Sequence, residues 1–231
     1  MNDILANLEF EPFILSFKLA GITTLILFIL SVPLAWYLSQ TRSKAKPFIE
    51  ALTALPIVLP PSVIGFYILV SLSANSPLGM FFENTFGIAL VFNFTSLVIA
   101  SCFYSLPFMV QPMQSGFESL DKNMLEASYC AGKGKWETIA KVALPNIKPA
   151  LLTAIIVTFA HTVGEFGVVL MVGGSIPGET KVASVAIYEF VETLDHDSAH
   201  IYSAIMVLIS FVVLLCVYIF NQKNKNRLAN V

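Results

Sequence analysis

Long runs of apolar residues, separated by short polar segments, make up most of this chain. An α-helix needs about 20 apolar residues to cross a hydrocarbon core of about 30 Å, and several runs reach that length. The runs are continuous, whereas the strands of a membrane barrel alternate apolar and polar positions over about ten residues. The pattern therefore predicts an all-α, polytopic helical bundle of about five transmembrane helices, at Leu15–Leu38, Phe48–Leu72, Gly87–Gln111, Pro149–Val172 and Ile201–Phe220.

Composition favours a membrane protein over a soluble domain. Hydrophobic residues make up 56% of the 231 residues and charged residues 12%. This charged share is about half of that in soluble domains. The sequence contains neither an internal repeat nor a low-complexity linker, so residues 1–231 are expected to form a single transmembrane domain, with one polar loop at about 118–148.

The distribution of lysine and arginine predicts the orientation. All but Lys18 and Lys181 of the 13 Lys and Arg residues fall in the 39–47 segment, the 112–148 segment or the C-terminal end. These segments lie on one side of a five-span arrangement, and basic residues concentrate on the cytoplasmic side of membrane proteins. We therefore expect the N-terminus outside and the C-terminus in the cytoplasm. The acidic start and the length of the first run favour an uncleaved span over a signal peptide.

Side chains with catalytic or metal-binding chemistry are few and scattered. His196 and His200 have the spacing of a helical metal pair, but a zinc site needs further ligands, and a solvated acidic loop is the favoured interpretation. The glycines at 173–180 lack the lysine of a phosphate-binding loop. We therefore expect no catalytic residue, no metal site, no cofactor bound by this chain and no nucleic-acid partner.

The polar loop at about 118–148 predicts an arm of two short helices. Asp121 and Asn123 are candidate N-caps for the first helix, and Gly132 is expected to break it by allowing a turn or a close backbone approach. The second helix is expected to end at Pro145, because proline cannot continue the hydrogen-bond ladder. An ordinary amphipathic loop is the alternative interpretation.

The same loop carries a spaced motif: Glu126-Ala127-Ser128, three residues, Gly132, nine residues, Val142, one residue, Leu144-Pro145. It resembles the cytoplasmic signature loop of ABC-importer permeases, with Ser128 and Val142 standing where that pattern has alanine and isoleucine. The resemblance implies that the loop docks on an ATP-hydrolysing subunit. It assigns coupling roles to six residues: Glu126, Ala127, Ser128, Gly132, Leu144 and Pro145.

Prolines mark the second predicted span. Pro56, Pro60 and Pro61 each remove a backbone donor, and the freed carbonyls need partners within protein or a wet cavity. This span is expected to bend and to face the interior of the bundle, where the prolines are pore or gate candidates. A kink that serves packing alone is the alternative.

The end of the fourth predicted span supplies the other pore or gate candidates, His161, Gly164, Glu165 and Gly167. Ala160 and Gly164 form a small-xxx-small pair that allows close helix packing. His161 and Glu165 are four residues apart, so on one helix they share a face and can hydrogen-bond. A carboxylate inside a membrane must face protein or water, and because it would repel an anion, we expect Glu165 to have a structural or gate role.

Two stretches narrow the resemblance. Residues 54–65 and 164–178 look like the molybdate-type permeases, which are close to the sulfate and tungstate permeases. This implies a type I ABC importer permease fold in the bacterial cell inner membrane, which works by alternating access. It also implies these partners: a second copy of the chain, two cytoplasmic ATPase subunits that bind ATP and Mg, an external or periplasmic oxyanion-binding protein, and membrane lipid.

The spans hold no Lys or Arg at a depth suited to tight anion binding, so selectivity is assigned to the binding protein. Neutral groups are candidates for a low-affinity path: Asn93, Thr95, Ser96, Ser101, Ser105 and Thr162. A sulfate/thiosulfate or tungstate permease is the nearest alternative. A membrane-embedded enzyme that uses His161 and Glu165, and an ion channel, are the alternatives from other classes. This sequence lacks the ring of charged residues expected in an ion channel, and a channel would leave the arm unexplained.

Overall fold

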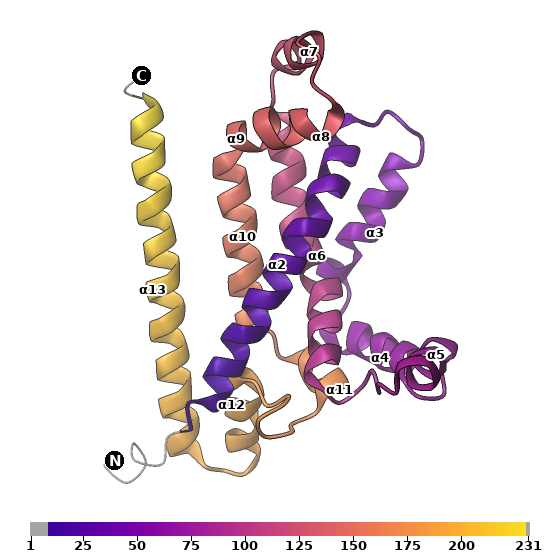
Figure 1. Cartoon of the computed structure of the whole chain (residues 1–231). Helices are drawn as coiled ribbons and strands as arrows, with labels where there is room; N and C mark the ends of the chain where they lie inside the picture. The colour runs from indigo at the N-terminus through magenta and orange to yellow at the C-terminus, as the bar shows by residue number, and fades with distance from the viewer. Residues whose placement is uncertain (1–8, 230–231) are drawn as a thin grey trace.

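The computed structural model of the chain describes residues 9–229, and within these residues it contains helices and connecting loops but no strand (Figure 1). The helices are α2 (Glu11–Gln40), α3 (Lys46–Val58), α4 (Pro61–Leu72), α5 (Pro77–Phe86), α6 (Phe94–Glu118), α7 (Lys122–Cys130), α8 (Lys135–Thr138), α9 (Leu144–Asn146), α10 (Lys148–Val163), α11 (Gly167–Gly173), α12 (Ala183–Glu192) and α13 (His196–Ala229), with a π-helical turn, η1 (Ile139–Ala143), between α8 and α9. The predicted all-α class is confirmed.

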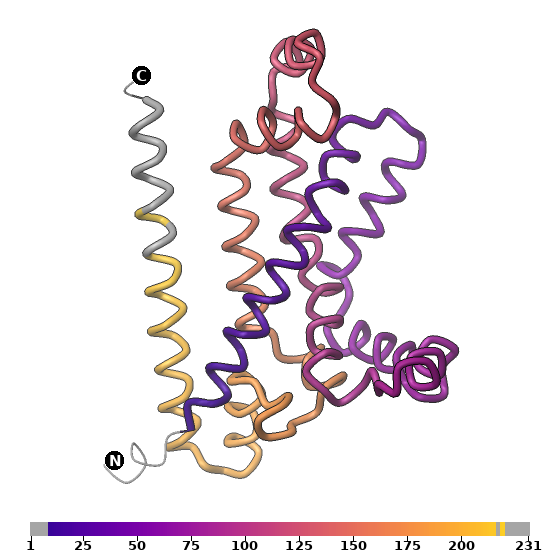
Figure 2. Tube along the Cα trace, viewed as in Figure 1, coloured from indigo at the N-terminus to yellow at the C-terminus, as the bar shows by residue number. Residues whose placement is uncertain are grey.

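The centre of the bundle is formed by α2, α6 and α10, which pack on one another (Figure 1). Trp36 of α2 meets Phe117 of α6 edge to face, with ring centroids 5.2 Å apart. This buried cluster also includes Leu125 and Ile139, so the arm at 118–148 is anchored on the core of the bundle. Figure 2 shows the arm at one end of the chain trace and the loops around α11 and α12 at the other.

Among residues 9–229, three helices are long and apolar enough to cross a membrane: α2, α6 and α13 up to Leu215. Up to five spans result if each of two bent helix pairs counts as one. The predicted first and fifth spans lie within α2 and α13. The other three predicted spans have different boundaries, each for a local reason.

The second predicted span is two helices. α3 ends at Val58, α4 begins at Pro61, and the two axes differ by 111°. Leu59 is extended, with ψ at 139°, because the residue before a proline is pushed out of the helical region. The predicted bend is present, but a single continuous helix is wrong. α4 packs on α11, whereas Thr53 is the one buried residue of α3.

The third predicted span starts too early. Gly87 is not its first residue: it adopts a left-handed conformation, with φ at 65°, and ends α5. The helix begins only after Asn93, whose side chain accepts a hydrogen bond from the backbone N–H of Ser96 in a reciprocal capping box. From there α6 continues beyond the predicted end to Glu118.

The fourth predicted span is also interrupted. α10 ends at Val163 and α11 begins at Gly167, so Glu165 lies in a break rather than on a helix face. At its other end α10 meets the arm at an angle of 84°. Five of the pore and gate candidates therefore lie at the two breaks, whereas Pro56 lies within α3 and His161 within α10; the five are Pro60, Pro61, Gly164, Glu165 and Gly167.

Candidate functional site

The arm begins with a capped helix. The Asp121 carboxylate accepts a hydrogen bond from the backbone N–H of Asn123 at 2.9 Å, so Asp121 is the N-cap of α7 and Asn123 lies inside the helix. Asp121 was a predicted cap, whereas the same prediction for Asn123 is wrong. Further along α7, Glu126 and Ala127 lie on its exposed surface.

Gly132 ends the first helix of the arm by its backbone conformation. Its φ is 77°, its N–H donates to the Tyr129 carbonyl at 2.9 Å, and the Lys133 N–H donates to the Ser128 carbonyl at 3.2 Å. This pair of bonds is a Schellman motif, in which glycine is the favoured residue. A Cβ at this position would meet nothing within 4 Å. Gly132 is therefore required for the turn and not for a close approach within this chain.

A buried hydrogen bond joins the two helices of the arm. The hydroxyls of Ser128 on α7 and Thr138 on α8 lie 3.0 Å apart, and the two residues are 6% and 0% exposed. Alanine at 128 would lack this bond. Serine at the third motif position therefore adds a direct connection across the arm, which motif matching did not predict.

We expect the variants Ser128→Ala and Thr138→Val each to destabilise the arm by about 1–3 kcal/mol, because each leaves one buried hydroxyl without a partner. The double variant is expected to cost less than the sum of the two. Limited proteolysis of the arm in the purified protein measures this. Additive losses in the double variant would show that the two hydroxyls do not stabilise the arm together.

The prediction that Pro145 ends the second helix of the arm is wrong. The backbone N–H of Leu144 donates to the Ile139 carbonyl in the wider π-helical turn, and Pro145 then lies in the first turn of α9, where a missing N–H costs little. The chain turns only at Ile147, before α10. Pro145 is exposed and Leu144 is partly buried.

Glu165 connects three elements at the break after α10. Its Oε2 accepts a hydrogen bond from the Ser101 hydroxyl of α6 at 2.8 Å. Its backbone carbonyl accepts one from the Ser184 hydroxyl of α12 at 2.5 Å. The residue is 4% exposed, and its Oε1 has no hydrogen-bond partner among the described residues. Glu165 thus faces protein, as expected, and holds α6, the break and α12 together.

His161 is connected separately. Its Nδ1 lies 3.0 Å from the Ser105 hydroxyl, and its ring centroid lies 4.0 Å from that of Phe108. No hydrogen bond joins it to Glu165 in the described structure, so that prediction is wrong. The reason is that α10 ends at Val163, so Glu165 is no longer on the helix and does not share a face with His161.

The neutral polar groups assigned to a substrate path are mostly used inside the protein. Asn93 and Ser96 cap α6, Ser101 binds Glu165, and the Ser105 hydroxyl lies 3.0 Å from that of Thr162. Ser101 and Ser105 are one turn apart on α6, so this face of the helix holds α10 and the following break. A substrate path lined by these groups stays a prediction.

Close packing joins the two breaks. A Cβ at Gly167 would lie 2.8 Å from the Cβ of Pro61, and a Cβ at Gly65 would lie 2.7 Å from the Cβ of Met171. α4 and α11 can therefore approach so closely only because these positions are glycine. Gly65 lies in the 54–65 stretch but was not predicted as a contact position.

The remaining candidates lie apart from this contact. Gly164 is exposed, and a Cβ there would be nearest to carbonyls of its own helix, at 3.7 and 3.8 Å. Within the described residues, the expected close packing at Gly164 is therefore absent. Pro56 lies inside α3, and Pro60 precedes α4. No group of three or more His, Cys, Asp or Glu suited to a metal ion occurs in the described part of the chain.

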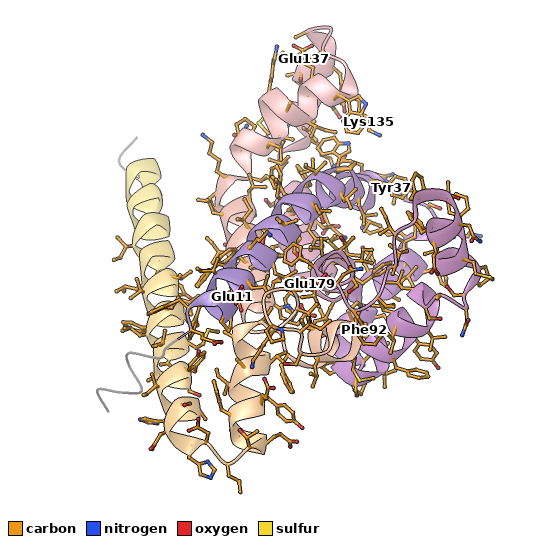
Figure 3. The ribbon with its side chains drawn as sticks, turned by 60° about the horizontal axis from the view of Figure 1, so that its bottom comes forward. Glu11, Tyr37, Phe92, Lys135, Glu137 and Glu179 are labelled. Carbon is orange, nitrogen blue, oxygen red and sulfur yellow. The ribbon has the colours of Figure 1, made fainter. Side chains whose placement is uncertain are left out.

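Charged side chains lie at both ends of the bundle. Lys135 and Glu137 lie on the arm, whereas Glu11 and Glu179 lie with Phe92 near the opposite end (Figure 3). Lys181, one of two basic residues outside the three basic segments, forms an ion pair with Glu189 near that opposite end. The orientation in the membrane stays a prediction.

Known proteins share this chain's sequence over most of its length. This chain is 46% identical to "Molybdenum transport system permease protein ModB" of Azotobacter vinelandii over 204 residues. The aligned residues make up 88% of this chain and 90% of that protein. It is 31% identical over 210 residues to "Probable sulfate transport system permease protein cysT" of Chlorella vulgaris, covering 91% of this chain and 79% of that protein.

Solved structures share the fold at low sequence identity. One chain of a bacterial ABC transporter involved in the import of alginate matches with a TM-score of 0.75 at 15% identity, covering 92% of this chain and 78% of that one. A chain of the MetNI methionine ABC transporter, in an inward-facing conformation, matches with a TM-score of 0.70 at 14% identity, covering 90% and 92%.

A family description matches almost the whole chain. Residues 21–230 match "Binding-protein-dependent transport system inner membrane component", a stretch that includes the arm and both breaks. Together with the relatives above 30% identity, this match shows that the chain belongs to the family of inner-membrane components of binding-protein-dependent transport systems.

Proposed function

We propose that this chain is the permease subunit of an ATP-driven importer of molybdate. The observation that carries the proposal is the 46% identity to a molybdenum permease over nearly the full length of both proteins. We further propose that residues 1–231 act as one transmembrane domain in the bacterial inner membrane, with the N-terminus outside and the C-terminus in the cytoplasm. The basic arm and the acidic opposite end support this orientation.

The arm is the proposed docking element for a cytoplasmic ATPase subunit. Glu126, Ala127, Gly132 and Pro145 are exposed on it, while Ser128 and Leu144 stabilise its packing. Its buried Leu125 and Ile139 belong to the same core cluster as α2 and α6. A force applied to the arm is therefore transmitted directly to these two helices. ATP and Mg are bound by the ATPase, and this chain carries out no chemistry.

Two copies of the chain form the proposed translocation path. The exposed apolar side chains of α3 and α4, including Phe48 at 72% and Tyr67 at 65%, can pack on a second copy or on lipid. An oxyanion-binding protein delivers cargo at the end opposite the arm. Closure of two ATPase subunits moves the two arms together, and the path alternates between its inward-open and outward-open states.

Transport by the reconstituted complex tests this proposal. Vesicles containing the permease, its ATPase and its binding protein are expected to accumulate molybdate with ATP, and not when the binding protein is omitted. Mass measurement is expected to find two copies of this chain for each ATPase pair. Faster uptake of sulfate or thiosulfate would favour the alternative supported by the 31% identity to a sulfate permease, and faster uptake of tungstate would favour a tungstate permease. Uptake without ATP would indicate a channel.

A further inference from the structure

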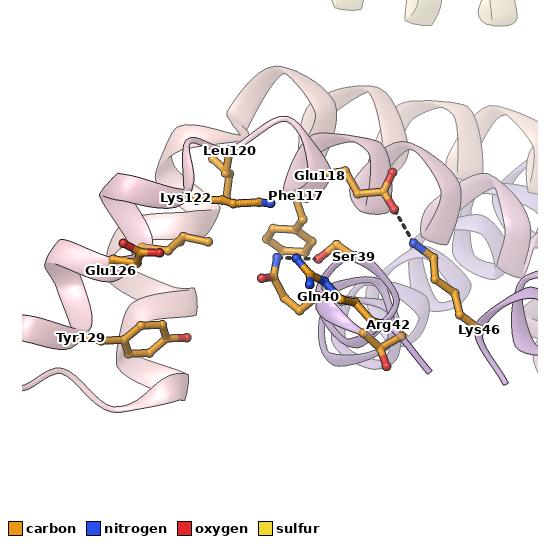
Figure 4. Close-up of a pocket in the computed structure, with 12 residues that line it drawn as sticks. Ser39, Gln40, Arg42, Lys46, Phe117, Glu118, Leu120, Lys122, Glu126 and Tyr129 are labelled. Carbon is orange, nitrogen blue, oxygen red and sulfur yellow. Dashed lines mark hydrogen bonds and ion pairs between the residues drawn. The ribbon is translucent and has the colours of Figure 1, made fainter. Parts of the chain in front are cut away.

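A groove of about 600 Å³ lies between the arm and the bundle (Figure 4). Its walls come from the end of α2 with the loop that follows, from the end of α6, and from α7. Because α2 and α6 are long and apolar enough to span a membrane, the place where both end lies at the level of the lipid headgroups.

The charges of the groove are only partly neutralised. Lys46 donates to Glu118 at 3.0 Å and lies 3.6 Å from Glu50, so its charge is matched. Arg42 and Lys122 also line the groove, and no ion pair within the described structure includes either of them. Glu126 is the remaining carboxylate. Figure 4 shows the ammonium of Lys122 extending toward Phe117, on the side where Gln40 and Arg42 lie. Two cations that line one groove without an ion-pair partner in the described structure favour an anion between them.

The apolar part of the groove limits the kind of anion. Of the apolar residues that line it, Phe117 and Leu125 are buried in the core, so the surface beside the cations comes from Leu120 and from Tyr129, which is 45% exposed. Tyr129 also lines a neighbouring groove of about 260 Å³ with Tyr37, which is 43% exposed, whereas Trp36 of that groove is buried. Aromatic side chains of this kind concentrate at membrane interfaces. A cationic edge with an adjoining apolar and aromatic surface fits an amphiphile better than a small free anion or an acidic peptide.

We propose that this groove binds the headgroup of an anionic phospholipid, with Arg42 and Lys122 on either side of its phosphodiester. The inference rests on the orientation given under the proposed function, because anionic lipids concentrate in the cytoplasmic leaflet, and basic pockets between spanning helices on that side bind such headgroups. A lipid held here touches α2, α6 and α7 at once, and so links the membrane surface to the position of the arm.

Lipid retention by the complete permease–ATPase complex tests the proposal. The complex is equilibrated with equal amounts of phosphatidylglycerol and phosphatidylcholine, and the lipids that stay bound are counted by native mass spectrometry. Wild-type protein is expected to retain phosphatidylglycerol preferentially. The double variant Arg42→Gln/Lys122→Gln is expected to lower that preference by roughly tenfold or more, since each cation near the membrane surface contributes about a factor of five. Glu126→Gln is expected to raise it.

The control is Lys44→Gln/Lys148→Gln, which removes the same charge at exposed positions outside the groove. If the control variant loses the preference for phosphatidylglycerol to the same extent, the effect is due to general surface charge and the proposal is overturned. An unchanged lipid ratio, with weaker co-purification of the ATPase, would instead assign the groove to an acidic segment of that partner. The ratio of bound phosphatidylglycerol to phosphatidylcholine is measured without transport. Failure of molybdate uptake would therefore contradict the proposed function but would leave this lipid measurement unchanged.

Discussion

Replacing Gly132 by valine is expected to abolish most of the ATP hydrolysis that the binding protein stimulates, while the bundle remains folded. The φ of 77° at this position is strained for a β-branched residue by about 1–3 kcal/mol. Such a strain shifts the arm away from the described conformation by roughly 5-fold to 150-fold. The measurement is stimulated and basal ATP hydrolysis by the reconstituted complex, together with co-purification of the ATPase.

Gly132→Asn is the matched control, because asparagine tolerates the left-handed region better than other residues with a Cβ. A Cβ at this position meets nothing within 4 Å, so asparagine is expected to retain most of the coupling. Equal loss in the asparagine and valine variants would mean that a partner contacts Gly132 directly. Normal coupling in the valine variant would show that the turn is not needed.

Replacing Glu165 by leucine is expected to destabilise the described conformation and to raise basal ATP hydrolysis several-fold. The Ser101 hydroxyl, 0% exposed, would lose the carboxylate that accepts its hydrogen bond at 2.8 Å. A buried donor without a partner costs about 1–3 kcal/mol. Glu165→Gln keeps an acceptor for Ser101 and is expected to keep most of the transport activity. Thermal unfolding and basal hydrolysis measure both variants.

Two further variants isolate the role of Glu165. Ser101→Ala combined with Glu165→Leu removes both polar partners and is expected to recover part of the stability lost with leucine alone. Ser184→Ala removes the bond to the Glu165 backbone and tests the connection to α12 without altering the carboxyl. If glutamine abolishes transport as fully as leucine, the charge itself is needed, and the structural role of Glu165 is wrong.

The arm illustrates what local sequence determines. The cap at Asp121 and the turn at Gly132 depend on residues within a few positions of each other, so their chemistry can be predicted from the chain alone. The same holds for the class of the protein, because the length of apolar runs and the distribution of Lys and Arg reflect the membrane directly. The signature spacing then predicted the family, which the match over residues 21–230 confirms.

The breaks show what depends on tertiary structure. Apolar residues continue through Leu59, and around Phe166 only Gly164 and Glu165 interrupt the apolar run, so hydrophobicity did not separate α3 from α4 or α10 from α11. Pro60 indicated a bend, but its angle of 111° is stabilised by close packing of α4 on α11, where Gly65 and Gly167 leave room for Met171 and Pro61. The partners of Glu165 could not be predicted from the sequence, because Ser101 and Ser184 are distant from it in the chain. The four-residue spacing between His161 and Glu165 would place them together only on a continuous helix.

The sequence by itself determined a helical membrane protein, its charge asymmetry and the motif of its arm, because each depends on composition or on short-range backbone chemistry. The tertiary structure alone decided how sharply the helices break and which buried hydroxyls hold Glu165, His161 and Ser128. Those choices follow from burial: a buried polar group that lacks a hydrogen-bond partner is costly, and for Glu165, His161 and Ser128 the partner hydroxyl lies on another helix.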